Sequence, residues 1–315
     1  MSASGAPNAL GIDLGGTKMA GAIVAPDGRI LERQTVPRPS TGSAMLTEPI
    51  ELAQRLVDES VGRVGVGAAG LVRASDGILV WGPNVAGEHV AFKQIFEDTL
   101  DRPVVVDNDA NVAALAETRI GAARGHMYVS MITLGTGIGG GWIVDGQPYR
   151  GRGFAGEIGH IVVDVGGQWC TCGQRGCWET FASGRRLDQM ARDLVATRPG
   201  GLVAKLADGA TPTGRHLTEA ALQGDWDAIA LIEEMGTWLG IGIANLIAAF
   251  DPEIVVIGGG VCHAGDALLD PTRESVRNAL EGSEHRPPTP IVTAELGEDA
   301  GVIGAALLAF ESIDT

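Results

Sequence analysis

Residues 9–24 read Ala9-Leu-Gly-Ile-Asp13-Leu-Gly-Gly-Thr-Lys18-Met-Ala-Gly-Ala-Ile-Val24, and this stretch decides the fold. An apolar run ends near Asp13, a glycine-rich turn follows, and a second apolar run ends at Val24. This pattern predicts two strands joined by a tight turn. Pro26-Asp27-Gly28 is a further turn signal, so residues 30–36 continue the meander as a third strand.

The second half of the chain repeats this arrangement. Residues 128–134 predict a strand, 135–141 a glycine turn and 142–144 another strand. The other expected strands are 64–66, 104–106 and 254–257; the expected helices are 44–61, 90–100, one from Asp109, 179–195, 218–222, 226–250 and 300–310. Strands that alternate with helices indicate α/β layers, and the repeated strand–turn–strand unit indicates a pseudo-repeat of architecture.

We therefore predict an α/β protein with two lobes hinged around a cleft, since no Pro- or Ser-rich linker separates the halves. Residues 1–115 with the C-terminal helix 300–315 form the smaller, N-terminal lobe. Residues 116–299 form the larger lobe.

Composition limits the class of protein. The chain has 315 residues, 45% of them hydrophobic, and a net charge of −16. An acidic surface repels phosphate backbones, so we expect no nucleic-acid partner. Three of the four cysteines are clustered, which favours metal binding in a reducing compartment over a secreted disulfide framework. The first eight residues lack a signal-peptide pattern and Leu239–Phe250 is too short to span a bilayer, so we expect a cytoplasmic protein with no membrane partner.

The first glycine turn, Asp13-Leu-Gly-Gly-Thr-Lys18, is a candidate phosphate site. Its glycines expose backbone N–H groups to an anion, and Thr17 and Lys18 add a hydroxyl and a cation. Asp13 is placed to orient Mg²⁺ or its waters. An ordinary hairpin turn would also explain two glycines here.

The second glycine turn, residues 134–141, contains a formal G-x-G-x-x-G. A strand follows it instead of a helix, which excludes a dinucleotide-binding motif. We expect the two turns to bind the phosphates of a nucleoside triphosphate. Gly258-Gly259-Gly260 follows a buried strand and is a candidate adenosine contact, or else a turn that precedes a helix. The candidate nucleotide and phosphate residues are Asp13, Gly15, Gly16, Thr17, Lys18, Gly135, Thr136, Gly137, Gly259 and Gly260.

Asp107-Asn-Asp109-Ala-Asn111 lies between a strand and a helix. Asp and Asn cap helices routinely, but one such residue is enough for a cap. A carboxylate here can accept a proton from a hydroxyl that attacks a γ-phosphoryl group. Gly82-Pro-Asn84 offers a further amide. The polar groups that suit a hexose are those of Asn84, Asn108, Asp109, Glu157, His160 and Glu179.

A Cys/His cluster follows Glu157-Ile-Gly-His160. His160, Cys170, Cys172 and Cys177 are the four N/S ligands that a tetrahedral zinc site needs, with no position left for a catalytic water. A disulfide would leave a third cysteine unpaired, so we predict structural Zn²⁺. Cys262 is expected to be a buried structural thiol. The glycines of residues 236–242 indicate close helix packing or a subunit contact.

Taken together, these motifs resemble the ROK family of sugar kinases and repressors, within the actin-like/hexokinase ATPase superfamily. The resemblance covers nearly the whole chain. The segments that carry it are Asp13–Lys18, Gly82–Asn84, Asn108–Asn111, Leu134–Gly141, Glu157–His160 and Cys170–Glu179. It implies a two-lobed actin-like (ribonuclease H-like) ATPase fold, with a duplicated mixed-sheet core around a central cleft.

The resemblance also implies roles for individual residues. Asp109 would be the catalytic base, and His160 would hold zinc and contact the sugar through different ring nitrogens. The expected activity is ATP-dependent phosphorylation of the 6-hydroxyl of glucose, with Mg²⁺ bound to ATP, by a homo-oligomer (dimer or tetramer). The alternatives are another hexose (N-acetylmannosamine, mannose, fructose or allose), polyphosphate as donor, a repressor, and a catalytically inactive sugar sensor. Asp109 and both phosphate turns argue against the sensor.

Overall fold

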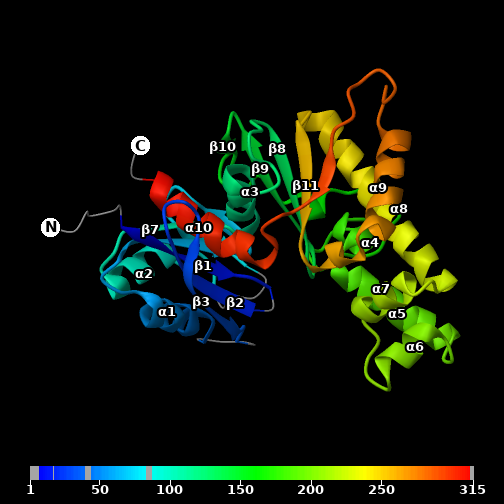
Figure 1. Cartoon of the computed structure of the whole chain (residues 1–315), viewed down its shortest axis with the longest axis horizontal. Coiled ribbons are helices and arrows are strands. Elements are labelled where there is room, and N and C mark those ends of the chain that lie inside the picture. The colour runs from blue at the N-terminus through cyan, green and yellow to red at the C-terminus, as the bar shows by residue number, and fades with distance from the viewer. Residues whose placement is uncertain (1–6, 17, 40–43, 83–86, 313–315) are drawn as a thin grey trace. The chain divides into compact units, whose positions relative to one another are not determined.

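The computed structural model describes residues 7–16, 18–39, 44–82 and 87–312 (Figure 1). Five strands form the first sheet. They are β1 (Asn8–Leu14), β2 (Lys18–Val24), β3 (Ile30–Pro37), β4 (Val61–Ala68) and β7 (Val104–Asn108). Their order is β3-β2-β1-β4-β7, with β1 antiparallel to β2 and parallel to β4. The expected meander is confirmed, since Leu14 pairs with Met19 across the first glycine turn.

The second sheet has the same plan. Its strands are β8 (Val129–Leu134), β9 (Ile138–Val144), β10 (Gln147–Pro148), β11 (Ile254–Gly258) and β12 (Ile291–Thr293). The order β10-β9-β8-β11-β12 again places two hairpin neighbours on one side of the first strand and two later strands on the other. The predicted duplication of architecture is therefore confirmed. A small antiparallel pair, β5 (Leu71–Arg73) and β6 (Ile78–Trp81), stands apart.

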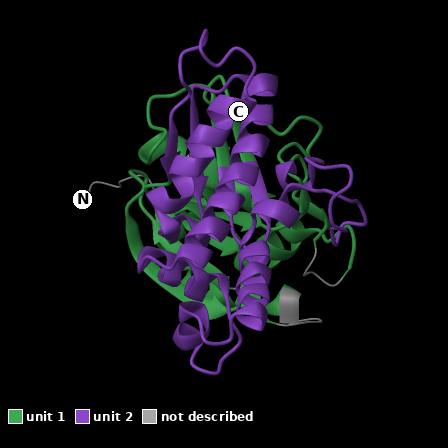
Figure 2. Ribbon diagram, turned by 90° about the vertical axis from the view of Figure 1, so that its right-hand side faces the viewer, with its two compact units in different colours: residues 1–131, 141–156, 294–315 green, residues 132–140, 157–293 purple. Residues whose placement is uncertain are grey.

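The chain forms two compact units (Figure 2). Unit 1 comprises residues 1–131, 141–156 and 294–315, and contains the first sheet. Its helices are α1 (Ala44–Leu56), α2 (Phe92–Leu100), α3 (Asp109–Ile120) and α10 (Ala300–Glu311). Helix α10 packs on α3 and on β1 and β4. Gly11 and Gly65 permit this contact, because a Cβ at either position would collide with backbone atoms of α10.

Unit 2 comprises residues 132–140 and 157–293. Its helices are α4 (Glu179–Ala182), α5 (Gly184–Thr197), α6 (Leu202–Ala207), α7 (Gly214–Leu222), α8 (Trp226–Phe250) and α9 (Asp266–Ala279), with 3₁₀ turns η1 (Ile158–His160) and η2 (Gly260–Ala264). Helices α8 and α9 pack closely. A Cβ on Gly236 would lie 2.7 Å from Pro271 and one on Gly240 2.5 Å from Ser275, which confirms helix packing as a reason for these glycines.

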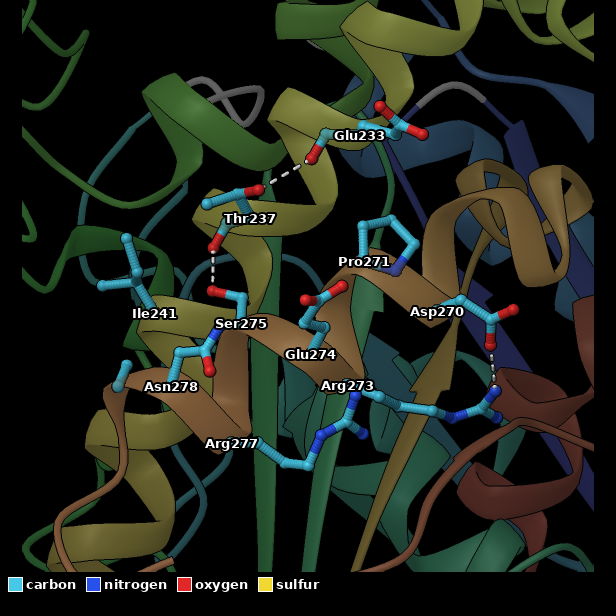
Figure 3. Close-up of a pocket in the computed structure, with 11 residues that line it drawn as sticks. Glu233, Thr237, Ile241, Asp270, Pro271, Arg273, Glu274, Ser275, Arg277 and Asn278 are labelled. Atoms are coloured by element: carbon cyan, nitrogen blue, oxygen red, sulfur yellow. Dashed lines mark hydrogen bonds and ion pairs between the residues drawn. The ribbon is translucent and has the colours of Figure 1, made fainter.

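Helix α8 has the length and hydropathy of a membrane-spanning helix, but half of its most apolar window is buried in the structure. Leu239, Ile243 and Ile247 lie on its buried face. This is the arrangement of a core helix, in which burial within the protein replaces contact with lipid. A groove of about 810 Å³ runs along α8 and α9, with Arg273 and Arg277 on its wall (Figure 3). It contains none of the predicted site residues.

Several expected boundaries were wrong. Helix α1 ends at Leu56 instead of Val61, because Asp58 starts a turn in which its carboxylate accepts from Ser60 N at 2.8 Å. Strand β9 begins at Ile138, so the second glycine turn is only three residues long. The helix expected at 179–195 is broken at Ser183, whose side chain caps α5. Helices α6 and α9 were not predicted. Pro271 lies inside α9, and its many charged residues weaken the apolar pattern by which a helix is predicted.

Candidate functional site

In unit 1, the predicted catalytic residues lie at one edge of the first sheet. Strands β1, β4 and β7 are parallel, and the register pairs Leu14 with Ala68 and Ala68 with Asn108. The carboxyl ends of β1 and β7 therefore share an edge, which is where ligands bind in α/β sheets. The structure thus brings Asp13 close enough to Asp109 for their charges to interact.

Asn108 is the N-cap of α3. Its side-chain oxygen accepts from Ala110 N at 2.8 Å and from Asn111 N at 3.3 Å, and its amide donates to Gly70 O at 3.1 Å. The capping interpretation is therefore right for Asn108. Asp109 follows as the first residue of the helix, where backbone N–H groups and the helix dipole favour a carboxylate.

The two carboxyl groups resist ionisation. Burial, and then the nearby Asp109, raise the pKa of Asp13 to about 7, although Lys18 and Arg33 act in the opposite direction. Burial also raises the pKa of Asp109, opposed by the N–H of Ala110 and by the charge of Arg38. Two acids in this arrangement form a site that a divalent cation would stabilise, because a cation offsets both their desolvation and their mutual repulsion.

Lys18, at the end of the first glycine turn, forms a 2.5 Å ion pair with Glu298. Arg33 on β3 forms a 3.1 Å pair with Asp299. Gly301, in the first turn of α10, leaves room for Asp13, since a Cβ there would lie 2.5 Å from its carboxylate. The start of α10 is therefore part of the surroundings of Asp13.

Two arginines at this edge were not predicted. Arg38 follows β3 and donates to Gly15 O in the first glycine turn. Arg150 follows β10, and its Nε donates to Asp107 Oδ2 at 2.6 Å. Both contacts span long stretches of sequence and belong to no local motif, so nothing in the residues around them signalled either role.

In unit 2, the predicted metal ligands come together. The ligand atoms of His160, Cys170, Cys172 and Cys177 all lie within 4.8 Å of one another. His160 Nδ1 is 3.7 Å from Cys170 Sγ, and the sulfurs of Cys172 and Cys177 are 3.6 Å apart. Among the described residues, all four cysteines are free of disulfides.

The spacing fits a tetrahedral zinc ion. Zn–S and Zn–N bonds of usual length give an S···S distance of about 3.8 Å and an S···N distance of about 3.5 Å. Burial, followed by the neighbouring thiols, raises the pKa of Cys177 to about 12. Three crowded thiols cannot all ionise without a cation, so the donor set is one that a metal would complete. The Nδ1 of His160 faces the cluster, which leaves Nε2 for another contact.

Glu179 joins this cluster to the second glycine turn. Cys170 Sγ donates to its Oε1 at 3.1 Å, and His160 Nδ1 lies 3.9 Å from the same oxygen. Its other oxygen lies where a Cβ of Gly137 would be. Gly159 in turn abuts the backbone of Ile138. The turn, the cluster and Glu179 are therefore one continuous structure.

Gly259 also lies against this turn. Its φ is 96°, and a Cβ on it would collide with the backbone of Leu134. Gly184 N donates to Gly135 O at 2.8 Å, which places the start of α5 beside the turn. Gly260 begins η2, so the alternative of a helix-preceding turn is realised at this position.

The remaining predicted residues are placed as follows. Glu157 is exposed, immediately before η1, and Gly135, Thr136 and Gly16 are exposed in their turns. Thr17 and Asn84 lie outside the described residues. The predicted sugar contacts divide between the units, with Asn108 and Asp109 in unit 1 and Glu157, His160 and Glu179 in unit 2.

The duplicated five-stranded sheets and the two glycine turns define a protein with the actin-like ATPase fold. The chain belongs to the ROK family, whose model matches residues 9–312.

Known relatives agree over nearly the full length. A glucokinase of Streptomyces coelicolor is 40% identical over 96% of this chain and 97% of its own. A glucokinase of Thermotoga maritima is 36% identical over 96% and 98%. The crystal structure of a ROK family glucokinase from Streptomyces griseus, in complex with glucose and AMPPNP, has a TM-score of 0.88 and 41% identity over 96% of this chain and 99% of that one.

Proposed function

We propose that this chain is an ATP-dependent glucokinase that transfers the γ-phosphoryl group of ATP to the 6-hydroxyl of glucose. The observation that carries the proposal is the position of Asp109, at the start of α3 and beside Asp13 at the carboxyl edge of the first sheet. The similarity to glucokinases over the whole chain supports the same activity.

Asp109 would act as the general base. Its carboxylate would accept the proton of the 6-hydroxyl as that oxygen attacks the γ-phosphorus in line. The transition state needs positioning and charge neutralisation more than covalent chemistry from the protein. The N–H groups at the start of α3 favour the ionised carboxylate that a base requires.

Asp13 would hold Mg²⁺ or its bound waters, and the cation would neutralise charge on the phosphates of ATP. The raised pKa of Asp13 fits this role, because the unfavourable ionisation of a partly buried acid is offset when a cation binds beside it. The phosphates would contact Gly15, Gly16, Thr17 and Lys18 and also Gly135, Thr136 and Gly137, with Gly259 and Gly260 near the adenosine.

Glucose would be bound by Asn84, Asn108 and Asp109 and by Glu157, His160 and Glu179. His160, Cys170, Cys172 and Cys177 would hold a structural Zn²⁺, which fixes the loop that carries Glu179. Cys170 Sγ and Glu179 Oε1 lie 3.1 Å apart, so a metal that fixes Cys170 would also fix the immediate surroundings of Glu179, which supports this link between metal and sugar.

A coupled assay of ADP release tests the proposal. Glucose, mannose, fructose and N-acetylmannosamine are supplied at equal concentration with ATP and Mg²⁺, and each assay is repeated with polyphosphate in place of ATP. We expect a clear preference for glucose and ATP. Preference for another sugar or for polyphosphate would contradict the proposed substrates but would leave the phosphoryl-transfer mechanism unaffected. If no combination of sugar and phosphoryl donor gives turnover, the proposal of an enzyme is contradicted and a sugar sensor is favoured.

We further infer a soluble, cytoplasmic homo-oligomer, a dimer or tetramer. Half of the most apolar window of α8 is buried within the structure, which supports a soluble protein, and the unpaired thiols fit a reducing compartment. Light scattering coupled to size-exclusion chromatography measures the mass directly, and a monomer would contradict the oligomer.

A further inference from the structure

Arg38 lies where the strand β3 ends and connects two parts of the unit 1 site. One terminal nitrogen of its guanidinium, Nη1, donates to Gly15 O in the first glycine turn. The same positive charge interacts with Asp109. Gly15 and Asp109 belong to the phosphate turn and the base of the proposed reaction, and among the described residues no other side chain forms both interactions.

The surroundings of Arg38 hold it in place. Its side chain lines a small apolar pocket with Leu14, Met19 and Phe92. Nε is buried and has no hydrogen-bond partner among the described residues. A buried N–H without an acceptor is costly, and removal of the charge from water lowers the pKa of Arg38 while Asp109 acts against that shift. This arginine is therefore kept at a stability cost, which functional sites commonly show.

The charges around Asp109 can be assigned by element. Arg38 approaches from the end of β3, and Asp13 from the end of β1. Lys18 on β2 and Arg33 on β3 act on Asp13. Arg38 is thus the cation that acts on Asp109 itself, whereas Lys18 and Arg33 already form ion pairs with Glu298 and Asp299.

We propose that Arg38 is a positioning residue for phosphoryl transfer, which holds the first phosphate turn in place through its hydrogen bond to Gly15 O. The inference rests on the proposed function for the assignment of this turn to ATP, but the contact with Gly15 concerns nucleotide binding alone. Arg38 acts on the reaction through Gly15 and is not assigned a contact with substrate.

Arg38→Met and Arg38→Lys test this contact. Methionine keeps an unbranched apolar stem over Leu14 and Phe92 but removes the charge and the donor. Lysine keeps the charge but has no guanidinium to reach the Gly15 carbonyl in the same geometry. Arg29→Met is the matched control, since Arg29 lies just before β3 and its exposed side chain pairs with Asp27.

For Arg38→Met we expect kcat to fall by about 10- to 100-fold, because a displaced phosphate turn no longer holds the γ-phosphoryl group in line. Mg·ADP affinity, measured by calorimetry, should fall several-fold, while glucose affinity without nucleotide stays unchanged. Arg38→Lys should recover little of the nucleotide affinity, and Arg29→Met should match the wild type.

Melting temperature and glucose affinity in the absence of nucleotide control for folding. If Arg38→Met keeps the wild-type kcat and Mg·ADP affinity, the proposal is overturned. If the melting temperature of Arg38→Met collapses, Arg38→Lys is the deciding variant, and a folded lysine variant with wild-type Mg·ADP affinity contradicts the role of the guanidinium at Gly15. Should the wild type fail to phosphorylate glucose, the proposed function fails, while the Mg·ADP measurement still tests the contact with Gly15.

Discussion

Arg150 donates from Nε to the carboxylate of Asp107 at 2.6 Å, two residues before the proposed base. Asp107 is almost fully buried, and its other oxygen accepts from Asn108 N at 2.8 Å and from Asn111 Nδ2 at 3.0 Å. One ion pair therefore fixes the junction of β7 and α3 from which Asp109 projects. This junction depends on a residue that follows β10, more than forty positions along the chain.

Replacement of Arg150 by methionine should leave Oδ2 of the buried Asp107 without its partner. We expect a loss of about 1–3 kcal/mol in the free energy of unfolding, because a charged acceptor loses its partner while Arg150 itself is partly exposed. The kcat should also fall, since α3 starts at this junction. Urea titration and the coupled assay measure both effects. Arg152→Met, an exposed neighbour, is the control; equal effects of the two substitutions would contradict the role of Arg150.

Asp109→Asn should remove the base and keep the shape of the site. We expect turnover to fall at least 100-fold, within the usual contribution of general-base catalysis. Glucose binding by calorimetry should remain measurable, since an amide still contacts a hydroxyl. Retained turnover above a hundredth of the wild-type value would remove Asp109 from the role of base.

The parts of the fold that depend on neighbours in sequence were predictable. The hairpin turns, the start of α3 at Asp109 and the full extent of α8 follow from local patterns. The convergence of His160, Cys170, Cys172 and Cys177 was also predictable, because these residue types at such close spacing are rarely combined except to bind a metal.

The contacts that depend on the assembled sheet were not predictable. Arg38 reaches Gly15 and Arg150 reaches Asp107 only because separate strands end at a common edge. Glu117 is a further case: its fully buried carboxylate accepts from Leu296 N at 2.8 Å, at the point where the chain returns to unit 1. Single arginine or glutamate residues occur throughout any sequence, so nothing local distinguishes these three.

Cys177→Ser should release the metal. Cys177 is fully buried within the ligand cluster, and a serine hydroxyl is a poor zinc ligand. We expect zinc content to fall well below about one ion per chain, with a lower melting temperature and a glucose KM raised about tenfold or more. Cys262→Ser is the control, because Cys262 lies outside the cluster and its thiol donates to Ile257 O, an acceptor that a serine hydroxyl can also use. Elemental analysis that finds full zinc occupancy in Cys177→Ser would contradict the ligand set.

Gly137→Ala should act on Glu179 alone. The added methyl would occupy the place of the Glu179 carboxylate, whereas a methyl on Gly135, two residues earlier in the same turn, meets nothing within 4 Å. We expect weaker glucose binding without nucleotide for Gly137→Ala, by several-fold, and unchanged binding for Gly135→Ala. Isothermal calorimetry compares the two. If both variants bind glucose like the wild type, Glu179 does not contact the sugar as proposed.

The raised pKa of Asp13 predicts how the free energy of unfolding depends on pH. Its pKa is raised to about 7 in the folded protein, against 3.8 as the ordinary value. Between these values the folded state holds a proton that the unfolded state has lost, so stability decreases as the pH rises from about 4 to about 7. Above that window the full cost of ionising the partly buried carboxylate is present.

Asp13→Asn should remove this cost. We expect the ligand-free variant to gain stability over the wild type at pH 8 and almost none at pH 4, while turnover with Mg·ATP is lost because the cation loses its carboxylate. Urea unfolding of both proteins from pH 4 to pH 8 measures the difference, in which the other titrating groups largely cancel. If the difference in free energy of unfolding between the two proteins stays constant with pH, Asp13 is ionised throughout this range. Its pKa is then not raised, and the prediction is contradicted.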